Sequence, residues 1–61
     1  MKQYIERVIS IKRLKNPEKV AVEIEKVASQ LHEEGWFFVN AITDEMMEST
    51  TLIFERDLEE L

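Results

Sequence analysis

The apolar residues near the start of the chain alternate between two faces, as they do in a β-strand. Residues 4–14 are rich in β-branched side chains, a composition that favours extended backbone. Three isoleucines share one face of such a strand and three other apolar residues share the opposite face: Ile5, Ile9 and Ile11 against Tyr4, Val8 and Leu14. The pattern therefore predicts a strand over residues 3–14 that is apolar on both faces.

The spacing of apolar residues changes to a helical repeat after Asn16. These residues recur three or four positions apart and form one stripe, namely Val20, Ile24, Val27 and Leu31. Asn16 can accept hydrogen bonds from the free N–H groups at a helix start, and Pro17 suits the first turn. Gly35 can adopt the left-handed conformation that ends a helix. These signals predict a helix over residues 17–34.

Two further strands are predicted in the second half of the chain. Residues 36–42 are apolar on both faces, and residues 49–56 place Leu52 and Phe54 on one face and Ile53 on the other. The segment between them lacks a tight-turn signal such as Asn-Gly, so we expect a longer loop or a bulge there. Residues 57–61 form a short acidic tail.

This order of elements predicts a single α+β domain over residues 1–61, with a three-stranded mixed sheet and one helix on one face. A helical crossover makes the first two strands parallel, and a hairpin makes the third antiparallel to both. A right-handed crossover allows the strand orders 1-3-2 and 1-2-3. We favour 1-3-2, because the charged first strand is then an edge, where lysine and arginine discourage uncontrolled pairing.

One helix can cover only one face of the sheet, so the other apolar face needs a partner. A chain of 61 residues buries a limited part of its surface, and this one has no cysteine for disulfides. We therefore expect a structural or interaction protein that forms a homo-oligomer, first of all a dimer, through an apolar sheet face. An unidentified protein partner is a further option. The candidate interface residues are Ile5, Ile9, Ile11, Phe37, Val39 and Ile53.

Charge is distributed unevenly along the chain. The formal net charge is −5, but residues 1–19 contain six basic and two acidic residues, for +4, and residues 20–61 carry the remaining −9. Overall acidity disfavours nucleic acid as a partner. The alternative hypothesis is a module that binds an anionic partner or nucleic acid through the basic first segment, with contacts from Arg7, Lys12, Arg13 and Lys15.

The titratable residues show no catalytic or metal-binding pattern. His32 is the only histidine, and the positions three and four residues away from it hold no metal ligand. No serine has the surroundings of a catalytic nucleophile. We therefore predict a protein that is not an enzyme and that uses no metal or cofactor. A third hypothesis is a small-molecule sensor with an apolar pocket between subunits, lined by Trp36, Phe38 or Phe54.

The longest uninterrupted apolar run is Trp36-Phe37-Phe38-Val39, which is far too short for a membrane helix. The first residues also lack the apolar stretch of a signal peptide. We expect a soluble cytoplasmic protein with no membrane partner. Trp36 directly follows the predicted helix end, which favours a hydrophobic seal between helix and sheet over an anchor at an interface.

The junction Glu34-Gly35-Trp36 holds the only glycine and the only tryptophan of the chain. With the opening strand, the amphipathic helix and the closing Leu52-Ile53-Phe54-Glu55-Arg56, it resembles a family of small bacterial and phage domains of unknown function. The resemblance covers most of the chain. It implies a strand-helix-strand-strand domain and carries over no catalytic residue.

Overall fold

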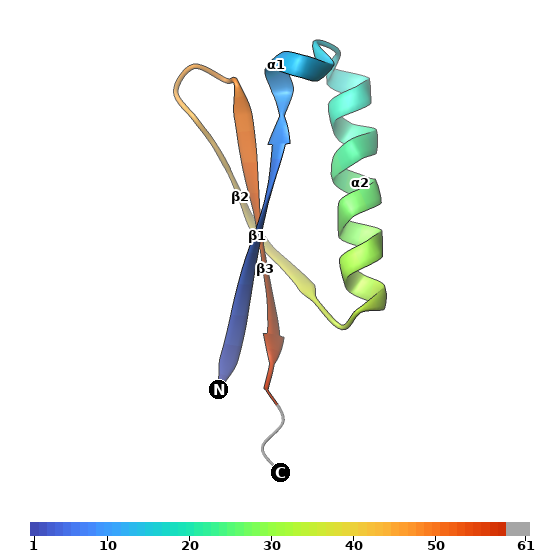
Figure 1. Cartoon of the computed structure of the whole chain (residues 1–61), viewed down its shortest axis with the longest axis vertical. Coiled ribbons are helices and arrows are strands. Elements are labelled where there is room, and N and C mark those ends of the chain that lie inside the picture. Colours follow the sequence, from blue (N-terminus) through green and yellow to red (C-terminus); the bar gives the residue numbers. More distant parts are fainter. Residues whose placement is uncertain (59–61) are drawn as a thin grey trace.

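The computed structural model describes residues 1–58. The elements follow in the order β1 (Lys2–Ser10), α1 (Ile11–Leu14), α2 (Pro17–Glu33), β2 (Phe37–Thr43) and β3 (Ser49–Asp57), as Figure 1 shows. The predicted α+β class is confirmed, and the bounds of the main helix and the last two strands agree with prediction to within one residue. Asp57 of the predicted tail ends β3, and residues 59–61 lie outside the described part.

The three strands form one sheet in the order β1-β3-β2, which confirms the favoured order. β3 is antiparallel to both neighbours, so β1 and β2 run parallel to each other as predicted. They are not neighbours, however, because β3 lies between them. Both hydrogen-bonded ladders are therefore antiparallel, and the term mixed sheet is corrected to antiparallel sheet.

The first strand ends four residues earlier than predicted, at Ser10 instead of residue 14. The side-chain oxygen of Ser10 accepts a hydrogen bond from the backbone N–H of Arg13 at 3.1 Å, which caps α1. Lys15 ends this short helix in the left-handed conformation, with φ 58°. A local cap thus overrides the strand preference of the β-branched run, and Ile11 and Leu14 leave the sheet.

The two predicted end signals of the long helix act as expected. The Asn16 side-chain oxygen accepts a hydrogen bond from the N–H of Glu18 at 2.8 Å, and Pro17 is the first helical residue. Gly35 follows the helix with φ 92°, a conformation that residues with a Cβ rarely adopt. The chain then turns directly into β2.

The core lies between α2 and one face of the sheet. Its buried apolar residues are Ile9 of β1, Leu31 of α2, Trp36 of the turn after α2, and Leu52 and Phe54 of β3. Trp36 is only 6% exposed, and the Arg56 guanidinium lies 4.3 Å from the centre of its ring. This placement agrees with a seal between helix and sheet.

The hairpin between β2 and β3 closes through Asp44. Its backbone oxygen accepts from the N–H of Met47 at 3.0 Å, and its carboxylate accepts from the N–H of Glu48 at 2.7 Å. Met47 is left-handed, with φ 55°. The reversal is therefore the longer loop, one of the two expected options. A bulge also interrupts β2, but it lies between Phe38 and Asn40, outside the segment for which it was expected.

The molecule is elongated and exposes much surface for its mass. Its dimensions are 45 × 22 × 12 Å and its radius of gyration is 12.9 Å, against roughly 10.5 Å for a compact chain of this length. Its accessible surface is 5021 Å², whereas a folded monomer of 7.3 kDa exposes roughly 4,200 Å². At the opposite end from α1, the N–H of Leu58 donates to the backbone oxygen of Met1 at 2.9 Å, which brings the two ends of the described chain together (Figure 1).

Candidate interaction site

The sheet face away from α2, here called the open face, carries side chains in three rows across the strands. In each row the central residue belongs to β3 and its two neighbours belong to β1 and β2. The rows are Tyr4–Glu55–Phe37, Glu6–Ile53–Asn40 and Val8–Thr51–Ile42. Apolar side chains thus occupy the four corners and the centre of the open face, with polar side chains between them.

The corner residues of the open face are strongly exposed. Tyr4, Phe37 and Ile42 expose more than half of their surface, and Val8 exposes 67%. Ile53, at the centre, is half-buried between the neighbouring strands. Scattered single apolar residues are ordinary on protein surfaces, but five on one sheet face, at its corners and its centre, are typical of an interaction site.

An ion pair lies at one end of the open face. The Lys2 ammonium donates to the Glu55 carboxylate at 3.0 Å, and this hydrogen bond and the charge of Glu55 raise the pKa of Lys2. A raised ammonium pKa stabilises the folded chain fully below the unfolded value of about 10.4, and this contribution is lost as pH rises through the folded value. Lys2 is therefore charged at neutral pH. Its positive charge offsets the negative charge of Glu55, which lies between Tyr4 and Phe37 in the row.

The structure places the six predicted interface residues on different surfaces. Ile9 is only 4% exposed and Ile5 packs against the core, so both belong to the face that α2 covers. Ile11 lies in α1, outside the sheet. Of the six, Ile53 lies at the centre of the open face. Phe37 lies at its margin, where the Phe37 ring also meets the His32 ring of α2 edge to face at 5.5 Å between centroids.

The last predicted interface residue, Val39, has no partner in the ladder because it sits in the bulge of β2. The residues that the sequence-based set missed are Tyr4, Val8 and Ile42. The alternation in the first strand did separate Tyr4 and Val8 from the isoleucines, but it could not tell which face the helix covers.

The outer edge of β2, here called the β2 edge, differs from the other edge of the sheet. All seven residues of β2 are exposed, and none is charged. The β1 edge instead carries Lys2, Glu6 and Arg7. Charged side chains on an edge discourage the addition of another strand, and the β2 edge lacks them. The bulge at Val39 interrupts this edge, so a new strand would pair on either side of it.

A groove of about 280 Å³ lies between α2 and β2. It is lined by three aromatic residues and four helix residues, namely Trp36, Phe38, Phe54, Glu25, Ala28, Ser29 and His32. Trp36 and Phe54 are buried, whereas Phe38 is exposed and meets the Phe54 ring edge to face at 5.7 Å between centroids. The three aromatics named for a sensor pocket therefore do meet, but within one subunit.

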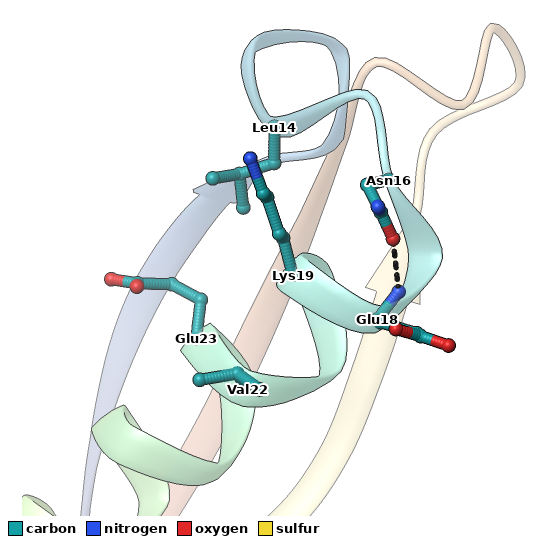
Figure 2. Close-up of a pocket in the computed structure, with 6 residues that line it drawn as sticks. All are labelled: Leu14, Asn16, Glu18, Lys19, Val22 and Glu23. Atoms are coloured by element: carbon teal, nitrogen blue, oxygen red, sulfur yellow. Dashed lines mark hydrogen bonds between the residues drawn. The ribbon is translucent and has the colours of Figure 1, made fainter.

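A second hollow, of about 420 Å³, lies at the start of α2. Figure 2 shows its lining, in which Asn16 is already bonded to the N–H of Glu18. The Glu18 and Glu23 carboxylates point in different directions. Binding sites for small molecules hold polar groups that converge on the ligand, and this hollow has no such arrangement among the residues drawn.

The four basic residues of the alternative hypothesis fall into two places. Lys12 and Arg13 belong to α1 and Lys15 follows it, so α1 brings these three to one end of the molecule. The Lys12 ammonium lies 4.0 Å from the Glu48 carboxylate. Arg7 remains apart in β1, where its guanidinium donates to the backbone oxygen of Glu6 at 2.9 Å.

Within residues 1–58, no three histidine, aspartate or glutamate side chains gather closely enough to hold a metal ion. In that same stretch, no helix has the length and apolar character to cross a membrane. Comparisons with protein-family models, with curated proteins and with solved structures found no significant match. The resemblance to small bacterial and phage domains therefore stays a prediction.

Proposed function

We propose that this chain is a structural or interaction protein that forms a homodimer through its open face. The observation that carries the proposal is the set of Tyr4, Val8, Ile42 and Ile53 on the sheet face away from α2, with Phe37 at the margin of that face. The partner that we propose for the open face is a second copy of the same chain. Two identical faces related by a two-fold axis would bury this cluster symmetrically.

The surface area supports the same proposal. The chain exposes 5021 Å², roughly 800 Å² more than a compact monomer of its mass. Each partner in a protein–protein interface of ordinary size buries about 800 Å². Burial of about that area on each chain would reduce its exposed surface to the value expected for its mass.

Three predictions from the sequence complete this proposal. We propose that the protein is not an enzyme, that it acts in the cytoplasm, and that it is related to the small bacterial and phage domains described above. The uncharged β2 edge supports a role in protein contacts. The alternative, an anionic or nucleic-acid partner, has its support in Lys12, Arg13 and Lys15 at the α1 end, and the overall acidity of the chain disfavours it.

Sedimentation equilibrium of three proteins tests the dimer. Val8→Glu places a carboxylate in the open face, and we expect it to raise the dissociation constant by about 100-fold, because the charge is buried without a partner. Val22→Glu is the matched control: the residue type is the same, its exposure is 64% against 67%, and it lies on α2. We expect the control to dimerise like the wild type.

Two results would overturn the proposal. One is a wild-type chain that stays monomeric at every concentration measured. The other is an equal loss of dimer in Val22→Glu, which would show that added charge, and not its position, controls association. Circular dichroism of each variant checks that Val8→Glu remains folded as a monomer.

A further inference from the structure

We infer that the β2 edge and the groove beside it form a binding site for an extended basic segment of a partner protein, which adds to the sheet as a further strand. This site differs from the open face, because the groove lies on the side of the sheet that α2 covers and strand addition uses the backbone of β2. Phe37 and Ile42 of β2 also belong to the open face. It adds a partner to the proposed function.

The first observation is the character of the edge. β2 pairs with β3 along one side only within the described chain, and its sequence Phe-Phe-Val-Asn-Ala-Ile-Thr has no charge to deter a new strand. Strand addition draws its affinity from backbone hydrogen bonds along such an edge, and its specificity from pockets for alternate side chains. The β1 edge, with Lys2, Glu6 and Arg7, is the protected edge of the same sheet.

The second observation is the groove, which supplies a pocket at the right place. Trp36 and Phe54 are buried beneath it and Phe38, a residue of β2 itself, forms part of its lining. A strand laid along β2 would present every second side chain toward α2. One apolar side chain of the added strand can therefore enter the groove while its backbone pairs with β2.

The third observation is charge, which selects the chemistry of the partner. Between Lys26 and Arg56 the chain has no lysine or arginine and six acidic residues, of which Glu55 is paired with Lys2 and Glu48 lies 4.0 Å from Lys12. These acids flank β2 at both of its ends, with Glu33 and Glu34 before it and Asp44 and Glu45 after it. Glu25 lines the groove itself. An extended segment in which basic residues alternate with apolar ones is complementary in charge to these acids. An acidic segment would be repelled by them.

Two synthetic peptides test the inference. The probe alternates lysine with valine and has one central leucine, and the control peptide has glutamate in place of each lysine. Trp36 is the only tryptophan and lies beneath the groove, so its fluorescence reports binding without a label. We expect the lysine peptide to bind and to shift the amide resonances of β2, and the glutamate peptide to bind at least about tenfold more weakly.

Three variants locate the site. Val39→Lys puts a charge on the β2 edge, and Ser29→Phe fills the groove from α2; we expect each to weaken the lysine peptide by about tenfold. Val22→Lys adds the same charge on the outer side of α2 and should change binding by less than about twofold. All three positions are exposed, so the folded state should be retained, which thermal melting checks.

Several outcomes would overturn the inference. These are no binding of the lysine peptide, equal binding of the two peptides, an equal loss in Val22→Lys, or resonance shifts that spare β2. Large wild-type assemblies without peptide would show that the β2 edge takes a second copy instead. Repeating the titration with Val8→Glu separates the two proposals, because peptide binding should survive loss of the dimer.

Discussion

Val8 and Ile9 are sequence neighbours with opposite surroundings, at 67% and 4% exposure. The sequence separates them into two faces but does not say which face receives α2, because both carry apolar residues. Only the packing of Leu31 and Trp36 over Ile9, Leu52 and Phe54 decides the question. An interface prediction based on alternation alone therefore mixed core residues with surface residues.

Shortening the Ile9 side chain by one carbon tests this assignment. We expect Ile9→Val to lower the free energy of unfolding by about 1 kcal/mol, since it leaves a small cavity in the core. Val8→Ala, measured at a concentration where the chain is monomeric, should cost less than about 0.5 kcal/mol. Urea unfolding measures both, and the reverse ranking would contradict the assignment of the faces.

Met47 holds a backbone conformation that its side chain does not favour, with φ 55°. The left-handed region costs an ordinary residue about 1 kcal/mol, and asparagine tolerates it better. We expect Met47→Asn to raise the free energy of unfolding by about 0.5 kcal/mol in thermal or urea unfolding. Met46→Asn, one residue earlier in the same loop, should have no such effect, and equal gains would show that polarity is the cause.

The elements could be predicted wherever a local signal marks them. Asn16 with Pro17 and the single Gly35 gave both ends of α2, and the charges of the first strand pointed to an edge position. The end of β1 could not be read in this way, because the cap that starts α1 is a single serine within a β-branched run. The bulge at Val39 was expected only as one option for the nearby reversal, since its position depends on how β2 meets β3.

Removing the cap of α1 tests its contribution. We expect Ser10→Ala to lower the free energy of unfolding by about 1 kcal/mol, because the N–H of Arg13 loses its acceptor. Ser49 is opposite Ser10 in the β1–β3 ladder and is the matched control. Ser49→Ala should change stability by less than half as much in the same urea experiment, and an equal loss would assign the effect to the sheet.

The molecule as a whole combines a small core with a large surface. Its elongated shape follows from one long helix that covers one face of a twisted sheet and leaves the other face open (Figure 1). The sequence could predict that one sheet face is apolar and uncovered, but it could not predict which residues form that face. The groove and the uncharged β2 edge meet only in three dimensions, because the groove joins residues of α2 to residues of β2 and β3.

A dimer that supplies part of the stability makes unfolding depend on concentration. We expect the midpoint of thermal unfolding of the wild type to rise over a roughly 100-fold increase in protein concentration, because mass action favours the associated state. Scanning calorimetry measures this rise. The midpoint of Val8→Glu should stay constant over the same range. A constant midpoint for the wild type would contradict a dimer that stabilises the folded chain.

The hydrogen bond from the N–H of Leu58 to the backbone oxygen of Met1 makes the described chain almost a closed circle. Joining its ends and reopening the circle at the loop after Asp44 would give a permuted protein in which β3 comes first and β2 last. Chain order would then differ while the packed neighbours stay the same, so the permutant would separate what the order of synthesis contributes to folding from what the contacts contribute.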